Sequence, residues 1–300
     1  MQDFIWMVYA LGSTAIYAIQ NPIDKFVLSK WEVKPHVFLL LGGVVGLGTA
    51  AIVLAWQGFP LLTEVELGWA LATGALFMLS FYFYLLAVRV EEISTVVSLF
   101  YLVPVQVTIL AGVFLGEVFD PSVYLGIALL VVGAILISSG TFSNFKVGRP
   151  LGLVLVATFC TAVAYVILKS ILTEANPWVV FAYVRVGEAV SVLPVAYFGF
   201  KEIKATLARQ GKRAIGAVAF QEALTVLALL LVTFATALSF VTFVNAIASL
   251  QPLFVLAIAL ALTKAKPDFL REEFSRSRLS TKLVSMLMMF VGTLLLLSLV

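Results

Sequence analysis

Hydrophobic positions in this sequence are gathered into ten long runs that are separated by short polar connections. The runs cover roughly residues 4–27, 36–56, 66–88, 93–116, 122–140, 151–172, 178–198, 214–236, 239–263 and 282–299. Most hold about the 20 apolar residues that an α-helix needs to cross a hydrocarbon core about 30 Å thick. The pattern therefore predicts an all-α membrane protein with ten transmembrane helices.

The composition supports this prediction and excludes several other classes of protein. Hydrophobic residues make up 62% and charged residues 12% of the 300 residues, whereas a soluble domain carries about 25% charged residues. Soluble enzymes, disordered chains and disulfide scaffolds are excluded, and an outer-membrane barrel is disfavoured because its strands alternate in hydrophobicity. The net charge of +3 is too small to indicate nucleic acid as a partner.

The basic residues are distributed unevenly among the connections. Of the 19 Lys and Arg residues, Lys169 and Arg185 lie inside runs, and the others lie in or beside the connections that follow the odd-numbered runs. Because basic loops stay in the cytoplasm, this asymmetry predicts that both termini face the exterior. The longest basic stretches, 201–213 and 264–282, are interpreted either as amphipathic helices in the membrane interface or as solvated loops.

The chain also shows an internal repeat. The pairs Tyr17 and Tyr165, Gly68 and Gly216, and Pro104 and Pro252 are all 148 residues apart and fall at corresponding places in their runs. An odd number of spans per copy makes the second copy enter from the opposite side, as in many secondary transporters. We therefore expect two inverted five-helix repeats, residues 1–145 and 146–300.

One stretch of the first copy resembles a known family. It contains Tyr82-Phe83-Tyr84-Leu85-Leu86-Ala87, Ser94–Ser98, Tyr101-Leu102-Val103-Pro104-Val105, Leu115-Gly116-Glu117 and the apolar segment from Gly126 to Gly133. These residues are similar to the EamA-type repeat of the drug/metabolite transporter (DMT) superfamily. The second copy departs from it, with Leu250-Gln251-Pro252 at the proline segment and Thr263-Lys264 in place of the Gly-Glu ending.

The resemblance implies a ten-helix bundle whose central cavity is lined mainly by spans one, three, four, six, eight and nine. It also implies termini in the cytoplasm, which is the habit of the family. The loop charges of this chain indicate the reverse, and we follow the charges.

Polar residues recur at helical spacing in five of the runs, and this pattern predicts the walls of a cavity independently of the resemblance. Unpartnered polar groups are not left in hydrocarbon, so such stripes face a cavity or a neighbouring helix. The expected substrate-binding residues are Tyr17, Tyr82, Ser98, Tyr101, Tyr165, Arg185, Glu222, Asn245 and Ser249. Pro104 and Pro252 are expected to kink their helices, either as hinges or as static bends.

Charged residues deep in the spans are the strongest functional signal. An isolated charge there costs at least about 2.5–3.5 kcal/mol, so Arg185, Glu188 and Glu222 need partners. One interpretation is structural: an ion pair of Arg185 with Glu188, and Glu222 hydrogen-bonded nearby. The other follows if Lys169 reaches water: one cation then faces two carboxylates, and the remaining charge needs a proton or a cationic substrate group. Glu188 and Glu222 are the expected coupling residues.

These patterns predict a secondary active transporter of the inner (cell) membrane that exports a small polar or amphipathic metabolite, such as an amino acid, by alternating access. We expect a monomer or homodimer in the lipid bilayer, with a small-molecule substrate and with no cofactor or metal. No nucleophile, phosphate-loop or zinc-protease motif indicates an enzyme. The alternative is a non-transporting membrane protein, either an enzyme with a catalytic pair near one interface or an assembly scaffold.

The predicted orientation can be tested with single cysteines in a Cys160→Ser background. An impermeant maleimide added outside intact cells should label a cysteine at Leu62, and should not label one placed within 201–213, because the basic connection stays in the cytoplasm. Labelling within 201–213 but not at Leu62 would refute the orientation.

Overall fold

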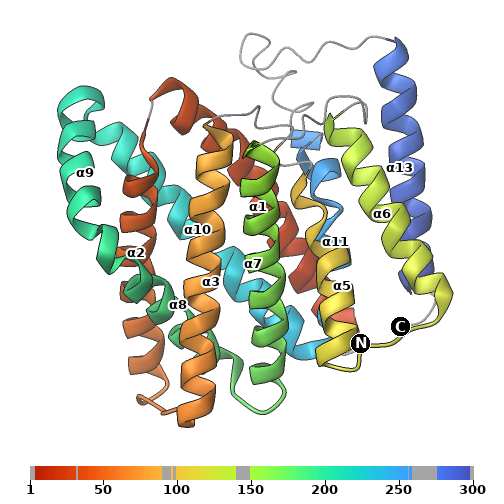
Figure 1. The fold of residues 1–300 in the computed structure, drawn as a ribbon, viewed down its shortest axis with the longest axis horizontal. Helices are drawn as coiled ribbons and strands as arrows, with labels where there is room; N and C mark the ends of the chain where they lie inside the picture. Colours follow the sequence, from red (N-terminus) through yellow and green to blue (C-terminus); the bar gives the residue numbers. More distant parts are fainter. Residues whose placement is uncertain are drawn as a thin grey trace.

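The computed structural model describes residues 4–31, 33–89, 96, 99–139, 149–255, 257–258 and 276–297. Within these ranges the chain is α-helical and contains no strand. Figure 1 shows most of the helices running side by side, with α2 and α9 at one edge of the molecule and α6 and α13 at the other. This arrangement places α1, α3, α7, α10 and α11 in the middle.

The helices follow the predicted apolar runs closely. They are α1 (Ile5–Lys30), α2 (Pro35–Trp56), α3 (Glu64–Val88), α5 (Val103–Phe114), α6 (Pro121–Ser139), α7 (Arg149–Leu172), α8 (Pro177–Val192), α9 (Ala196–Gln210), α10 (Lys212–Leu238), α11 (Val241–Ala248) and α13 (Arg276–Leu297). By length and composition, five helices of the described chain can cross a membrane, namely those within 35–56, 64–88, 151–172, 177–210 and 212–238. Five shorter apolar helical segments accompany them.

The segment after α8 differs from a solvated loop, one of the two interpretations of residues 201–213. A single 3-10 turn, Leu193–Val195, joins α8 to α9, and α9 carries the helix through this basic segment to Gln210. Gly199 and Thr206 of α9 are buried, and Glu202 accepts a hydrogen bond of 2.6 Å from Lys34 at the start of α2. The other basic stretch, 264–282, lies outside the described residues up to 275, and α13 begins at Arg276.

The prolines of spans four and nine begin new helical segments, where a kink in a continuous helix was expected. A turn at Tyr101-Leu102 precedes α5, in which Pro104 occupies the first turn. A second turn, at Ser249-Leu250, precedes the helical segment that contains Pro252. The first turn of a helix tolerates proline because its N–H groups have no helical acceptor. Both breaks fall at equivalent places, 148 residues apart.

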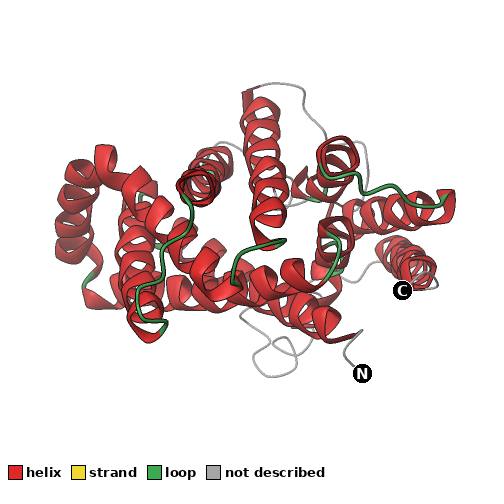
Figure 2. Ribbon diagram, turned by 90° about the horizontal axis from the view of Figure 1, so that it is seen from below, coloured by secondary structure: helices red, strands yellow, loops and turns green. Residues whose placement is uncertain are grey.

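Helix packing joins the two halves of the chain in reciprocal pairs. The helix α1 packs along α10, and α3 packs along α7; α2 contacts α8, and α6 contacts α13. Figure 2 looks at the bundle from below and shows it built of helices joined by loops. The core is therefore built between the halves, and a cavity at its centre is lined from both.

The two ends of the bundle differ in chemistry. At one end, Val27, Val37, Leu85 and Ala214 pack together, so the end of α1, the start of α2, the end of α3 and the start of α10 meet there. We call this the basic end, because Lys34, Arg89 and Lys212 lie at these helix termini. At the other end, Trp178 contacts both Trp56 and Phe234, with ring centroids 5.0 and 4.9 Å apart, and we call this the aromatic end.

A capping box starts α3 at the aromatic end. The hydroxyl of Thr63 accepts a hydrogen bond from the backbone N–H of Glu66, and the Glu66 carboxylate accepts one from the Thr63 backbone N–H. The reciprocal bonds satisfy N–H groups that would otherwise lack an acceptor. This sequence signal fixes where the helix begins.

Glycines allow the closest helix contacts. A Cβ at Gly74 of α3 would lie 2.1 Å from the carbonyl oxygen of Val184 in α8, and one at Gly187 would lie 2.3 Å from the carbonyl oxygen of Leu71. Gly133 and Gly292 make a similar reciprocal contact between α6 and α13. Any side chain at these positions would push the helices apart, because backbone atoms have no room to move.

We predict that Gly74→Ala destabilises the protein by roughly 1–3 kcal/mol, the usual cost of overpacking. Gly68→Ala is the matched control, since it lies on the same helix and nothing lies within 4 Å of its added Cβ. Alanine favours a helix over glycine by about 1 kcal/mol, so the control should melt at the same or a higher temperature. Thermal unfolding of the detergent-purified variants measures this, and equal melting temperatures would contradict the proposed contact.

Candidate functional site

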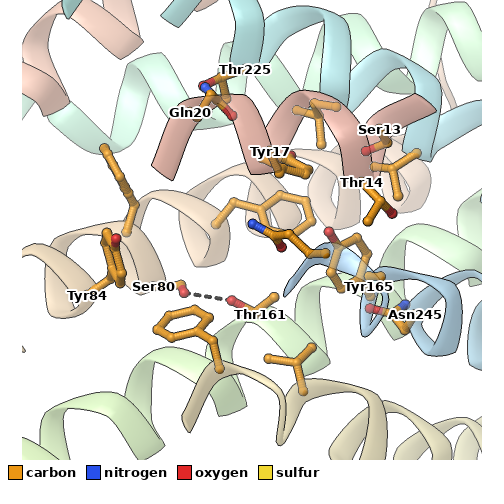
Figure 3. A pocket seen from close by; sticks show the side chains of 18 of the residues that line it. Ser13, Thr14, Tyr17, Gln20, Ser80, Tyr84, Thr161, Tyr165, Thr225 and Asn245 are labelled. Atoms are coloured by element: carbon orange, nitrogen blue, oxygen red, sulfur yellow. Dashed lines mark hydrogen bonds between the residues drawn. The ribbon is translucent and has the colours of Figure 1, made fainter. Parts of the chain in front are cut away.

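A cavity of about 320 Å³ lies at the centre of the bundle, between the two halves of the chain. The described lining comes from α1, α3, α7, α8, α10 and α11, together with residues beside the breaks that precede α5 and follow α11. Side chains from these elements point toward a common space in Figure 3. A cavity of this size with a few polar groups among apolar ones is typical of a small-molecule site.

The cavity lies between the two ends: its lining on α1 begins at Ala10, one turn after Trp6, whereas its lining on α3 lies toward the basic end. Its lining on α3 extends from Phe77 to Tyr84, in the half of the helix that ends at the basic end. The preceding turns of α3, from Glu64 to Leu76, contribute no lining residue.

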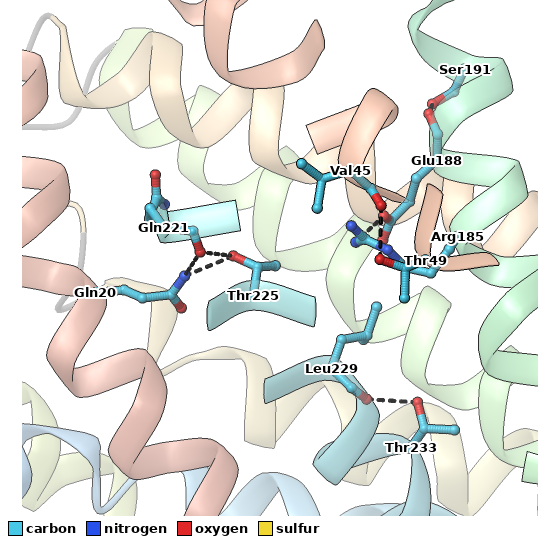
Figure 4. Close-up of polar contacts among 10 residues, drawn as sticks. All are labelled: Gln20, Val45, Thr49, Arg185, Glu188, Ser191, Gln221, Thr225, Leu229 and Thr233. Atoms are coloured by element: carbon cyan, nitrogen blue, oxygen red, sulfur yellow. Dashed lines mark hydrogen bonds and ion pairs between the residues drawn. The ribbon is translucent and has the colours of Figure 1, made fainter. Parts of the chain in front are cut away.

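Three charged residues line the cavity in the described part of the chain: Arg185, Glu188 and Glu222. Arg185 and Glu188 form an ion pair between adjacent turns of α8, shown in Figure 4, and they are 1% and 5% exposed. Glu222 reaches the cavity from α10 and is 4% exposed. Charges this deeply buried must be paired, because removing them from water costs several kcal/mol each.

The guanidinium of Arg185 retains unused hydrogen-bonding capacity. Its Nη1 donates a hydrogen bond to Glu188, while Nε and Nη2 are buried and have no hydrogen-bond partner among the described residues. Buried N–H groups are nearly always bonded in proteins, so two unbonded donors on one side chain are unusual. They mark Arg185 as a group that can accept a further anionic or carbonyl partner.

Two glycines on one face of α2 leave room for the side chains of Glu222 and Arg185, which come from different helices. A Cβ at Gly42 would lie 3.0 Å from Oε2 of Glu222, and a Cβ at Gly46 would lie 3.1 Å from Nη2 of Arg185. The two glycines are one helical turn apart, so the carboxylate and the guanidinium occupy adjacent turns along the same face. A side chain at either glycine would therefore crowd one of the two charged groups.

Aromatic rings form much of the remaining wall. Tyr165 packs edge-on against Phe77 with ring centroids 5.2 Å apart, and Tyr84 lies between Phe81 and Phe100 at 6.1 and 5.3 Å. Tyr17 lines the same cavity as Tyr165, Arg185, Glu188 and Glu222. The charged groups and the tyrosines are therefore parts of one site.

Two polar bridges hold the walls together. Gln20 of α1 donates to the backbone oxygen of Gln221 at 2.9 Å and to the hydroxyl of Thr225 at 2.7 Å, both on α10 (Figure 4). The hydroxyls of Ser80 on α3 and Thr161 on α7 lie 2.6 Å apart (Figure 3). The first bridge joins α1 to α10 and the second joins α3 to α7, and both lie among the residues that line the cavity.

Most of the residues proposed from the sequence surround this cavity. Those that line it are Tyr17, Tyr101, Tyr165, Arg185, Glu188, Glu222, Asn245 and Ser249. Tyr82 instead packs beside a cluster formed by Leu39, Leu40, Met78 and Val192, outside the cavity lining. Ser98 lies outside the described residues.

The sequence analysis did not propose several of the polar lining residues, among them Ser80, Tyr84 and Gln221. Ser80 and Tyr84 follow Phe77 at the spacing of one helical face, but the neighbouring residues are all aromatic or apolar, so no polar stripe stood out. Gln221 precedes Glu222, and consecutive helix positions point in different directions, so a stripe through Glu222 does not include it. The helical period of Phe77, Ser80, Phe81 and Tyr84 was the available signal.

We predict that Arg185→Ala lowers stability by about 3–5 kcal/mol, because the buried carboxylates then lack their cation. Lys34→Ala is the control, since it breaks an ion pair with Glu202 in which the Lys34 side chain is 43% exposed. Such a pair contributes at most about 1 kcal/mol. The yield of monodisperse protein and its melting temperature compare the two, and equal losses would contradict a buried electrostatic role for Arg185.

Comparisons with known proteins agree with the fold. A solved structure described only as "Crystal structure of protein" aligns with a TM-score of 0.65 and 16% sequence identity, covering 98% of this chain and 96% of that chain. At this identity the likeness concerns the fold alone. No curated protein matches the sequence.

The family comparison concerns the first half of the chain. The model of the EamA-like transporter family matches residues 4–139, and the match ends at the last residue of α6. Together with the long apolar helices, it indicates a multi-pass integral membrane protein. Residues 4–139 are thus similar to the EamA-like transporter family of the drug/metabolite transporter superfamily.

Proposed function

We propose that this protein is a secondary active transporter of the inner cell membrane that exports a small polar or amphipathic metabolite, such as an amino acid, by alternating access. The observation that carries the proposal is the central cavity, which is lined by both halves of the chain and contains buried charges. A scaffold would have no need of charged side chains at this depth, where each is costly. The match of residues 4–139 to a transporter family supports the same assignment.

The proposal includes two inverted five-helix repeats, residues 1–145 and 146–300, that form ten membrane spans. The packing of α3 against α7 corresponds to that of α10 against α1 when the halves are exchanged. The breaks at Tyr101 and Ser249 are 148 residues apart, and both residues line the cavity. Discontinuous helices at a central site are a feature of transporters with inverted repeats.

Substrate recognition is assigned to the lining residues. Tyr17, Tyr101 and Tyr165 supply apolar ring surface together with hydroxyl groups, which suits an amphipathic solute. The side-chain amide of Asn245 donates to the backbone oxygen of Val241, so its oxygen can face a ligand, and the Ser249 hydroxyl is buried with no hydrogen-bond partner in the described chain. Arg185 offers two unbonded N–H groups to a carboxylate or carbonyl.

The charge balance favours coupling or a cationic substrate group. Arg185 carries one positive charge, and Glu188 and Glu222 carry two negative charges when both are ionised. Lys169 does not offset them, because its ammonium donates to the backbone oxygens of Thr236 and Ser239, outside the cavity lining. The three side chains together therefore carry one excess negative charge, which a proton or an ammonium group of the substrate would balance.

A flux screen in proteoliposomes tests the proposed function directly. Purified protein is reconstituted with each member of a library of amino acids, amines and other small metabolites, and uptake is compared with that into protein-free liposomes. The proposal expects saturable flux of at least one solute. Absence of flux across the library, with the protein shown to be folded and inserted, would overturn it.

The coupling assignment predicts a specific phenotype for Glu222→Gln. The amide keeps the shape and hydrogen-bonding groups of the carboxyl, so the fold should survive while the titrating group is lost. We expect transport to lose its pH dependence, or the preference for cationic solutes to fall by about tenfold or more, which is the effect of roughly 1.4 kcal/mol of binding energy. Flux against pH for both proteins measures this, and an unchanged pH profile together with an unchanged solute range would make Glu222 a structural residue only.

A further inference from the structure

The turn between α10 and α11, at Ser239-Phe240, is held by two charged side chains that belong to other elements. Glu117, in the connection after α5, is only 4% exposed. Its two carboxylate oxygens accept hydrogen bonds from the backbone N–H groups of Val241 and Thr242, at 3.0 and 3.1 Å. These N–H groups begin α11 and have no acceptor within the helix, so the carboxylate satisfies them and meets the positive end of the helix dipole.

Lys169 holds the other side of the same turn. Its ammonium, on α7, donates to the backbone oxygens of Thr236 and Ser239, at 3.0 and 2.7 Å. These carbonyls end α10, where a positive charge is favoured by the helix dipole. Glu117 and Lys169 also attract each other electrostatically. We call the two side chains and the turn between α10 and α11 the clamp.

The clamp lies at the aromatic end, beside packed rings. Phe119, two residues after Glu117, contacts Phe240 and Phe243 with ring centroids 5.2 and 4.8 Å apart, and Trp6 stacks on Phe243 at 6.4 Å. These rings join the connection after α5 to α11 and to the start of α1. They close the bundle at the end away from the basic residues.

Two helices that the clamp joins, α11 and α7, also contribute to the cavity wall. Asn245 is one turn after the N–H groups that Glu117 binds, and Ser249 is one turn further along. Tyr165 precedes Lys169 by one turn on α7 and also lines the cavity. A movement that opens the aromatic end must therefore separate elements that Glu117 and Lys169 now join.

We propose that the clamp is the gate of the aromatic end: Glu117 and Lys169 keep the cavity closed there, and their contacts with the turn must break before the cavity opens to that side. The inference rests on the transport function proposed above, which requires an opening on each side. Glu117 and Lys169 act as positioning residues, since they hold helices and do not reach the substrate. Weakening the clamp shifts the population toward conformations that are open at the aromatic end.

The test measures access to the cavity from each face of the membrane. Ala248 lines the cavity, so Ala248→Cys in a Cys160→Ser background reports accessibility to an impermeant maleimide. Leu61→Cys and Gln210→Cys, at exposed positions of the aromatic and basic ends, identify which face the reagent has reached. Labelling is followed in intact cells and in inverted vesicles, and purified variants are checked for a monodisperse peak.

Glu117→Gln should raise the labelling rate of Ala248→Cys from the Leu61 face by roughly tenfold, because it removes a charge-assisted pair of hydrogen bonds. Lys169→Gln should act in the same direction and serves as the test if Glu117→Gln yields no monodisperse protein. Glu66→Gln is the matched control: it changes the same residue type, in a cap at the same end, but its cap holds only the start of α3. Its labelling rate should equal that of the parent.

Unchanged labelling from the Leu61 face in both clamp variants would overturn the gate, and so would an equal increase in Glu66→Gln. The measurement needs no substrate, so it separates the two proposals. A flux screen without any transported solute overturns the transport function, whereas unchanged accessibility overturns the clamp alone.

Discussion

The side chain of Arg185 is only 1% exposed inside an apolar bundle, and the packing of the neighbouring helices accommodates its charge. Glu188 neutralises it from the adjacent turn of its own helix. Gly46 of α2 leaves room for its outer nitrogens, and Gly74 and Gly187 let α3 and α8 approach to backbone contact beside it. A buried charge is tolerated only when it is paired, so the glycines that make room for Arg185 and the carboxylate that neutralises it are both required. The cavity lies beside this ion pair, and α8, α10 and α1 are among the helices that line it.

Hydrophobic periodicity anticipated most of the helices, because in a bilayer the length of an apolar segment is fixed by the thickness of the hydrocarbon. It also placed Tyr17, Tyr165 and Glu222 in stripes that face the centre, since polar groups in a membrane protein have few other places to go. The prolines were located correctly as irregular points. Their effect was underestimated, because a proline in the first turn of a new helix and a proline that bends a continuous one look the same in sequence.

Other parts of the site depend on tertiary contacts that one sequence does not encode locally. Tyr82 was expected among the substrate-binding residues, yet in the structure Tyr84 lines the cavity and Tyr82 does not. Tyr82 and Tyr84 are two positions apart, so they differ by about 200° in direction and lie on nearly opposite faces of α3. Glu117 was noted as part of a motif without a role, because its partners are backbone N–H groups more than 120 positions along the chain, and an N–H group carries no sequence signature.

The close contact of Gly74 with α8 has a counterpart that differs in kind. In the repeat scheme proposed above, an offset of 148 residues makes Glu222 the equivalent of Gly74, and Glu222 lies against Gly42 of α2 as Gly74 lies against α8. The contact of α3 with α8 is thus made by backbone atoms, whereas the equivalent contact of α10 with α2 is made by a carboxylate. The two open conformations of such a carrier are consequently not energetic mirror images: one rearranges a rigid backbone contact and the other an ionisable one. On the transport function proposed above, a proton or a cation would act on only one of these two contacts, although the architecture is duplicated.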